Sequence, residues 1–249
     1  MLDLLREVYY VSWADLRFLK HNFPNILITS LVSPILYLIT FGYGLGRGMS
    51  SGDISYIAFI IPGIVALSSL SSSFSSTSTR INVQRLYYKS FDEMMMCPLR
   101  PTAIILGKSM MGVLRGLLSC SIIFIMGLIL SPELMLTPLF IGCLLISCFS
   151  FSFLGVMAAL LAKSHQTLAT FNSLVILPMT FLCGTFFSVS SVPALFQYIL
   201  YLFPLTHASM CVRASALGWV FPWGSLAVLI GFGIAFYIID VYLIKTRKV

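Results

Sequence analysis

Hydrophobic residues fill long stretches of this 249-residue chain, and charged residues are confined to short segments between them. From Lys20 to Arg47 there are 26 residues without Asp, Glu, Lys or Arg, and from Lys163 to Arg213 there are 49. A helix needs roughly 20 apolar residues to cross a bilayer core that is about 30 Å thick. The pattern therefore predicts a series of membrane-spanning helices.

Six spans fit the uncharged stretches best. They are expected at about 26–46, 56–79, 108–130, 135–162, 167–190 and 222–244. With this layout nearly all Lys and Arg residues fall on one side of the membrane, and only Arg47 and Arg213 fall on the other. Because basic residues favour the cytoplasmic side, both termini are expected there. The sequence predicts an all-α, multi-pass protein of the inner (cytoplasmic) cell membrane.

The longest uncharged stretch has room for two spans, but Gly184, Pro193 and Pro204 interrupt it. A full seventh span would place the basic C-terminal residues outside, against the positive-inside rule. We expect instead a re-entrant helical hairpin at 193–215 that enters the membrane from outside and returns. Its motif ends at His207. Irregular backbone at that depth requires surrounding protein or water. A seventh span is the alternative, and the accessibility of a C-terminal tag distinguishes the two.

Composition agrees with a single transmembrane domain over residues 1–249. Hydrophobic residues make up 59% of the chain and charged residues 9%, whereas a soluble domain carries about 25% charge. The charged segments are too short to fold alone, so soluble energy-using machinery is expected on another chain. The net charge of +7 comes from basic residues that flank the spans, which indicates contact with anionic lipid and not with nucleic acid.

The N-terminal segment 1–25 is expected to form an interfacial amphipathic helix. Its apolar arc comprises Leu4, Leu5, Val8, Val11, Leu16 and Leu19, opposite a basic arc, and Asp15 interrupts the apolar side. Such a helix lies in the headgroup plane with its apolar side toward the lipid. An ordinary lead-in helix without a further role is the alternative.

Segment 80–101, between the second and third predicted spans, is expected to be cytoplasmic and to contain a short coupling helix. The candidate coupling residues are Ser90, Phe91, Asp92, Glu93, Met94 and Met95. Ser90 and Glu93 have the spacing of a capping box, and Pro98 marks the end of the helix. Methionines make an adaptable apolar surface that suits docking of a soluble partner. A plain surface loop is the alternative.

Two charged residues are expected inside the membrane, where charge is costly. Arg115 lies roughly 8 Å inside the third predicted span if the span enters near Lys108 or Met110. Asp240 lies at a similar depth from the same side in the last span. We hypothesise that the two form an intramembrane ion pair. The alternative is that Arg115 extends to lipid phosphates while Asp240 faces water.

Residues 68–79 are rich in serine and threonine. One interpretation is a wettable wall of a substrate path, with Ser69, Ser72, Ser73 and Ser76 as candidates. The other, which we favour, is close helix packing, because small side chains let helices approach each other. Gly112 and Gly116 in the third predicted span have the same small-residue spacing.

The chain itself is not expected to be an enzyme. Leu106-Gly107-Lys108-Ser109 resembles part of a phosphate-binding loop, but Thr102 stands where that motif needs its first glycine. The sequence contains no evident nucleophile–base pair and no metal-ligand cluster, and the six cysteines lack a Cys-x-x-Cys pair. We therefore expect no bound cofactor or metal in this chain.

Three stretches resemble the permease subunits of the ABC type-2 exporter family, which includes drug, lipo-oligosaccharide and polysaccharide exporters. They are Arg85–Lys108, Asn172–Phe187 and Pro193–His207. The family usually has Gly-Thr where Lys89-Ser90 stands, and an aromatic residue where His207 stands.

The resemblance implies a permease that pairs with a second copy and binds two cytoplasmic ABC ATPase subunits, which would hold ATP and magnesium. Closure of the ATPases would expel a substrate outward through the permease dimer. The apolar, aromatic-rich spans suit an amphipathic or hydrophobic substrate that is drug-like or lipid-linked, with a lipo-oligosaccharide or polysaccharide as the alternative. An ion-coupled secondary transporter is an alternative of a different class, which usually needs carboxylates near the bilayer midplane.

Overall fold

The computed structural model describes residues 2–40, 56–132, 134–185, 187 and 193–246, and the structural statements below refer to these residues. They form helices and connecting turns and contain no strand, which confirms the expected all-α class. Five segments are long and apolar enough to cross a membrane: Phe23–Thr40, Tyr56–Leu86, Pro101–Leu130, Pro138–Leu161 and Trp223–Thr246.

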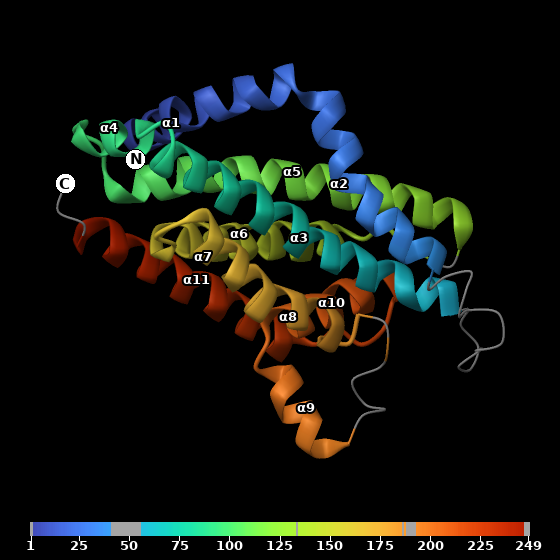
Figure 1. Cartoon of the computed structure of the whole chain (residues 1–249). Coiled ribbons are helices and arrows are strands. Elements are labelled where there is room, and N and C mark those ends of the chain that lie inside the picture. The colour runs from blue at the N-terminus through green and yellow to red at the C-terminus, as the bar shows by residue number, and fades with distance from the viewer. Residues whose placement is uncertain (1, 41–55, 133, 186, 188–192, 247–249) are drawn as a thin grey trace.

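The helices pack mainly as one elongated bundle (Figure 1). In chain order they are α1 (Leu2–His21), α2 (Phe23–Tyr37), α3 (Tyr56–Leu86), α4 (Ser90–Met96), α5 (Pro101–Leu130), α6 (Pro138–Leu161), α7 (His165–Phe171), η2 (Asn172–Ile176), α8 (Leu177–Leu182), α9 (Ala194–Tyr201), α10 (Pro204–Leu217) and α11 (Trp223–Thr246). Helix α3 is buried along most of its length between α5, α6 and α10, and α11 packs against α6. The core of the protein therefore surrounds α3.

Helices α3 and α5 are longer than the spans expected at 56–79 and 108–130. The first continues to Leu86 and the second begins at Pro101. The short helix α4 lies between them in sequence. The two long helices thus run past the predicted membrane edge and carry α4 at their ends.

The span expected at 167–190 is a broken helix. It consists of α7, the π-helical turn η2 and α8, and it is not among the five candidate spans. Pro178 near the start of α8 has no N–H to donate to the preceding turn, and a π turn is a common way to accommodate such a break. Whether this segment crosses the membrane stays a prediction. Its expected end at 188–190 lies outside the described residues, as do Arg47 and residues 41–46 of the first span.

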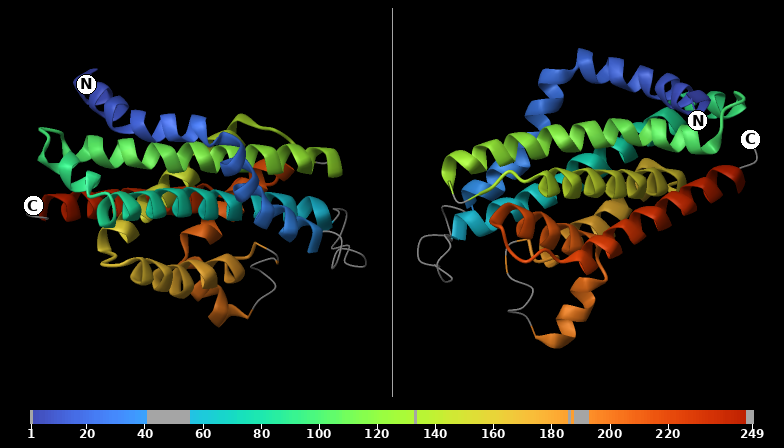
Figure 2. Two further views of the ribbon diagram at one scale, coloured as in Figure 1. Left: turned by 45° about the horizontal axis from the view of Figure 1, so that its top comes forward. Right: turned by 180° about the vertical axis from the view of Figure 1, so that it is seen from behind.

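The stretch expected to form the hairpin contains two helices, α9 and α10, with Pro193 at the N-cap of α9 and Pro204 as the first residue of α10. The Thr206 hydroxyl donates to the Leu200 carbonyl at 2.6 Å, and His207 Nε2 lies 2.9 Å from the Tyr201 carbonyl. Helix α10 is buried in the bundle, whereas α9 projects from its side (Figures 1 and 2). His207 therefore holds the corner of the hairpin; the depth of the hairpin in the membrane stays a prediction.

Candidate functional site at the α4 end of the bundle

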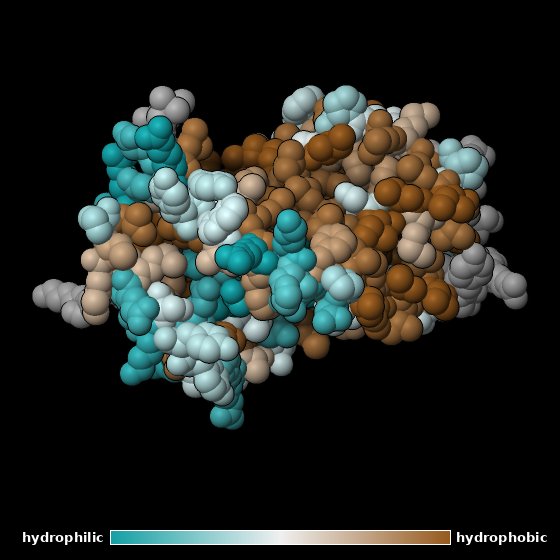
Figure 3. All heavy atoms as spheres, turned by 90° about the horizontal axis from the view of Figure 1, so that it is seen from above, coloured by the Kyte–Doolittle hydropathy of each residue, from teal (hydrophilic) through white to brown (hydrophobic). Residues whose placement is uncertain are grey.

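One end of the bundle carries the start of α1, the whole of α4 and the C-terminal end of α11 (Figures 1 and 2). Seen from above, hydrophilic surface gathers at this end, and most of the remaining surface on that face is hydrophobic (Figure 3). A protein that spans a membrane keeps its polar surface out of the hydrocarbon. The α4 end is therefore a part of the molecule that lies outside the bilayer core.

Helix α4 starts differently from the expected capping box. Its N-cap residue is Lys89, with φ of 54° and ψ of 7°, and no side chain caps the helix. The backbone N–H groups of Asp92 and Glu93 donate to the Lys89 carbonyl at 3.0 and 3.2 Å. Ser90 is already inside the helix, so the capping-box prediction is wrong. A left-handed conformation costs a non-glycine residue about 1–2 kcal/mol, which explains why glycine suits this position.

Three apolar residues of α4, Phe91, Met94 and Met95, face the bundle and not the solvent, which differs from the expected docking face, whereas Met96 is exposed. Phe91 is buried with Ile81, Ile105 and Leu160, and Met94 and Met95 pack against the same cluster. A helix of seven residues needs such contacts to be held in place. The exposed residues in and beside α4 include Tyr87, Tyr88, Glu93, Met96 and Cys97, and we call these five the exposed α4 surface.

Helix α1 is joined to this end by a buried charged group, the Asp15 cluster. Asp15 Oδ1 accepts from Arg80 Nε at 2.9 Å and from Gln84 Nε2 at 3.1 Å, and Oδ2 lies 2.9 Å from Lys108 Nζ. The side chains of Asp15 and Lys108 are 1% and 2% exposed. The Arg80 guanidinium also lies over the Phe18 ring at 4.1 Å. One carboxylate thus connects α1 to α3 and α5, the two helices that flank α4.

The contacts between α1 and α5 advance along both helices in the same direction. Near the start Glu7 approaches Arg100, with 3.7 Å between the charged atoms, further on Val11 packs at Gly107, and then Asp15 meets Lys108. Most of the apolar arc of α1 therefore packs against protein, although Leu5 is exposed, and Asp15 is placed within the arc to reach its cations. In the sequence, a lone acid in an apolar arc is the signal for this cluster, but the cations that Asp15 reaches lie on other helices.

A second cation, Arg85, joins the end of α3 to the end of α6. Its Nη1 donates to the carbonyls of Ala159, Leu160 and Ala162 at 2.6, 3.1 and 2.7 Å. The last carbonyls of a helix lack intrahelical partners and carry partial negative charge. Arg85 therefore caps α6 and fixes the stem on which α4 stands.

The four serines considered for a substrate path are buried. Ser69 and Ser73 are inaccessible, and Ser72 and Ser76 are nearly so. A side-chain methyl at Gly112 would collide with Thr77 and Ser152, and one at Gly116 would collide with Ser73. The contact between α3 and α5 is thus close enough to require glycine on α5. This arrangement supports the packing interpretation for these serines.

Other hydroxyl groups of α3 line a hollow in the structure. Ser75, Ser78 and Thr79 line a hollow of about 240 Å³ together with His165 of α7 and Asn172 of η2. Phe74, which also lines it, stacks on Phe171 with 6.0 Å between ring centres. The hollow combines hydrogen-bonding groups with an aromatic surface, and its described lining has no acidic, lysine or arginine side chain.

Arg115 and Asp240 do not pair in the structure. Arg115 Nε donates to the Ser30 hydroxyl at 2.9 Å and Nη2 to Thr29 Oγ1 at 3.2 Å, so its guanidinium faces α2. Asp240 is buried on the side of α11 that faces the bundle, and neither of its carboxylate oxygens has a hydrogen-bond partner among the described residues. The hypothesis is wrong because the two side chains leave α5 and α11 toward different neighbours.

The opposite end of the bundle contains a buried cation of another kind. Arg213 of α10 donates to the carbonyls of Phe59, Gly184 and Thr185 at 3.2, 3.1 and 3.1 Å. Its guanidinium also lies 3.9 Å from the centre of the Phe59 ring. Within the described residues no acid takes part, so neutral carbonyl groups and a ring surround the charge. Arg213 holds α10, the start of α3 and the turn after α8 together.

Comparison with known proteins adds to this geometry. A family model described as ABC-2 type transporter matches residues 6–217. The inner membrane transport permease YadH of Escherichia coli K12 is 27% identical over 241 residues, covering 92% of each chain. Nodulation protein J of Rhizobium leguminosarum bv. viciae is 28% identical over 239 residues, covering 95% of this chain and 89% of its own. Nodulation protein J of Rhizobium meliloti is 27% identical over 213 residues, covering 84% and 78%.

Proposed function

This chain belongs to the ABC-2 type transporter family, and we propose that it is the membrane permease subunit of an ATP-driven exporter. The family assigns a transport role to a membrane subunit that works with ATPase subunits. Export, the substrate and the assembly described below are our proposal.

The α4 end carries this proposal. A short helix with an exposed surface stands on two long helices and is braced by the Asp15 cluster and by Arg85. Because the inner side of α4 is packed into the bundle, force applied to the exposed α4 surface would be passed to α3 and α5. An ATPase that closes on ATP binding is the kind of partner that needs such a contact.

In this proposal two ATPase subunits bind ATP and magnesium, and the chain itself holds neither. They dock on the exposed α4 surface of each of two permease copies, with both termini of each permease on the cytoplasmic side. Their closure changes the packing of the two permeases and releases the substrate outward between them.

We propose an amphipathic or hydrophobic substrate that is drug-like or lipid-linked. The polar hollow between α3 and α7 supports a substrate with a polar, uncharged part, because hydroxyl, amide and imidazole groups line it. A lipo-oligosaccharide or a polysaccharide is the alternative. Stimulation of ATP turnover by candidate compounds, measured on the reconstituted complex, distinguishes these classes.

The six native cysteines provide a test of the membrane orientation. Cys97 follows α4 and is exposed, whereas Cys120, Cys143, Cys148, Cys183 and Cys211 are buried. A maleimide that cannot cross membranes should therefore label the unmodified chain at Cys97 from the cytoplasmic side only. Inside-out and right-side-out vesicles give the comparison, and Cys97→Ser is the control. Labelling from the outer side would overturn the proposal.

Coupling is tested with variants of the exposed α4 surface. Tagged chain is purified with the ATPase subunit that accompanies it from its native cells, and ATP turnover is measured in liposomes. Met96→Asp should lower turnover at least tenfold while leaving thermal stability unchanged, because Met96 is exposed. Tyr198→Asp on the exposed face of α9 is the matched control. Equal turnover in both variants, or no accompanying ATPase, would contradict the proposal.

Asp240 is the observation that favours an ion-coupled transporter as the second candidate. A buried carboxylate with no hydrogen-bond partner among the described residues, inside a candidate span, is the group that such a transporter uses. Transport by liposomes that contain the chain alone, driven by an ion gradient and abolished by Asp240→Asn, would support that candidate. Transport that needs the ATPase and ATP would support the exporter.

A further inference from the structure

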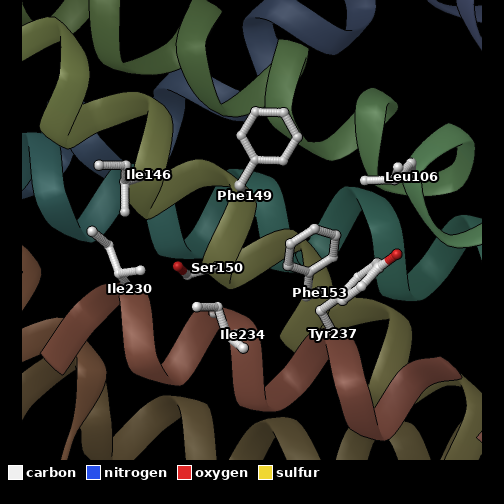
Figure 4. Close-up of a pocket in the computed structure, with 9 residues that line it drawn as sticks. Leu106, Ile146, Phe149, Ser150, Phe153, Ile230, Ile234 and Tyr237 are labelled. Atoms are coloured by element: carbon white, nitrogen blue, oxygen red, sulfur yellow. The ribbon is translucent and has the colours of Figure 1, made fainter. Parts of the chain in front are cut away.

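A groove runs along the bundle between α6 and α11. Ile146, Phe149, Ser150 and Phe153 form one wall, and Ile230, Gly233, Ile234 and Tyr237 form the other. Both sets have the spacing i, i+3, i+4, i+7, so each lies on one face of its helix. Leu106 of α5 also lines the groove, whose volume is about 430 Å³ (Figure 4).

The groove is closed toward the inside of the protein. A side-chain carbon at Gly233 would lie 2.6 Å from Ser150 Oγ, so the two helices touch at this point. The Ser150 hydroxyl donates to the Leu229 carbonyl at 3.5 Å. Ser150, the polar side chain of the floor, thus already has an acceptor. The other described residues of the lining are glycine, aliphatic or aromatic, and among them Tyr237 adds a hydroxyl. An occupant of this groove must be apolar.

The position of the groove determines which apolar molecule can reach it. Its two walls belong to Pro138–Leu161 and Trp223–Thr246, both candidate membrane spans. Ile230 and Ile234 are partly open to the surroundings, and the surroundings of a spanning helix are lipid chains. From Ile230 to Tyr237 the wall is roughly 10 Å long at 1.5 Å per residue, which suits an extended hydrocarbon chain.

The end of the groove nearest α4 becomes polar. Figure 4 shows the Tyr237 ring at that end, with its hydroxyl directed toward Leu106. Lys245, in the last turn of α11, is exposed and lies roughly 12 Å further along the helix. Asp240, the one acid between them on α11, is buried against the bundle. A cation beyond a tyrosine is the arrangement that anionic headgroups favour at a membrane surface.

We propose that this groove binds one anionic phospholipid, with an acyl chain between α6 and α11 and its phosphate near Lys245. Because the surrounding lipid tails are as apolar as the groove, the hydrophobic effect does not hold the acyl chain in the groove. Packing against Phe149, Phe153 and Ile234 selects the site, and the charge of Lys245 selects the headgroup. This site is independent of the proposed export function.

The test compares two isoleucines that lie one turn apart on α11. Ile234 lines the groove and is 54% exposed, whereas Ile238 is 60% exposed and does not line it. The full chain is reconstituted in nanodiscs of equal parts phosphatidylglycerol and phosphatidylcholine, and native mass spectrometry counts the lipids retained after release. Wild type should retain one phosphatidylglycerol. Ile234→Trp, which fills the groove, should lower that retained fraction at least tenfold, and Ile238→Trp should not change it.

Lys245→Gln tests the headgroup part. The variant should retain a lipid but lose about fivefold of its preference for phosphatidylglycerol over phosphatidylcholine, the factor expected for one lysine near the surface. If Ile234→Trp does not fold, Ile230→Trp replaces it as a second groove-filling variant.

Equal retention in the Ile234 and Ile238 variants would overturn the site, because it would show general contact with lipid. A retained mass that is not a phospholipid would overturn the assignment of the occupant, and an unchanged preference in Lys245→Gln would overturn the role of that lysine. A dimer lost in Ile234→Trp alone would show that a second copy covers the groove.

Discussion

The two ends of the bundle hold buried cations in different ways. At the α4 end, Lys108 and Arg80 share the carboxylate of Asp15. At the opposite end, Arg213 is held by three backbone carbonyls and the ring of Phe59. The first arrangement is lost when one acid side chain, Asp15, is replaced. The second arrangement relies on backbone carbonyl groups, which remain when another side chain is substituted.

This difference indicates what each end is built for. A carboxylate between two cations connects three helices through side chains, so small movements of α1, α3 or α5 change its contacts directly. A guanidinium on carbonyl groups fixes one backbone geometry. Arg85 fixes the ends of α3 and α6 in this second way, so the contrast applies to the joint that α1 makes with α3 and α5. We infer that this joint can transmit a displacement while the opposite end resists one, and the variants below test that contrast.

Asp15→Ala should have the largest effect. It leaves Lys108 buried without a counter-charge, and breaking a buried pair costs about 3–5 kcal/mol. Thermal unfolding in detergent measures the loss. Glu7→Ala on the same helix is the control, because the Glu7–Arg100 pair is long and more exposed and such pairs contribute about 0–1 kcal/mol. The double variant Asp15→Asn with Lys108→Met should recover part of the lost stability. Equal losses of stability in Asp15→Ala and Glu7→Ala would refute the importance of the Asp15 cluster.

Arg213→Gln should be next, with a loss of about 2–3 kcal/mol, because hydrogen bonds to a charged group contribute more than neutral ones. Arg213→Lys should recover only part of it, since an ammonium cannot bind several carbonyls and stack on a ring at once. Trp219 lies 6.5 Å from Phe59 between ring centres and reports locally by fluorescence. Full recovery by lysine would show that charge alone matters at this end.

Gly112→Ala tests whether the packed middle joins the two ends. The added methyl collides with Thr77 and Ser152, and overpacking of this kind costs about 1–3 kcal/mol. Hydrogen exchange should increase at both α1 and α10. Gly142→Ala is the control, because nothing lies near its side-chain position and alanine suits a helix better than glycine. Faster exchange at only one end would show that the ends are independent.

Lys89→Gly should have the smallest effect and the opposite sign. Glycine relieves the left-handed conformation that precedes α4, with a gain of about 0.5–1 kcal/mol. Lys163→Gly is matched to it, since Lys163 is also an exposed loop lysine but its φ is not positive, and glycine there should lower stability slightly. A loss of stability in Lys89→Gly would mean that the lysine side chain contributes to the α4 end.

Much of the bundle follows from counting uncharged residues, because the bilayer sets the length of a spanning helix. The expected spans at 56–79, 108–130, 135–162 and 222–244 therefore correspond to α3, α5, α6 and α11. The ends of α3 and α5 were missed, since a helix that leaves the membrane can continue through polar residues. The inward face of α4 was missed for a related reason: periodicity shows which residues share a face but not which neighbour covers it.

The Asp15 cluster depends on residues that are far apart in sequence. Asp15, Arg80 and Lys108 belong to three helices, and no local pattern brings them together. The prediction that Arg115 pairs with Asp240 is wrong for a related reason. Similar depth in the membrane does not define the direction in which a side chain points. The packing of the Ser-rich segment was better predicted, since small residues at helical spacing have a direct physical reason to be buried.

The separation of 93 residues between Asp15 and Lys108 also sets an order of biogenesis. Ribosomes add about 5–20 residues per second, so roughly 5–20 seconds pass between synthesis of the acid and synthesis of its buried cation. During this interval the first helix cannot adopt its final position, and it docks only after the third long hydrophobic segment has left the ribosome.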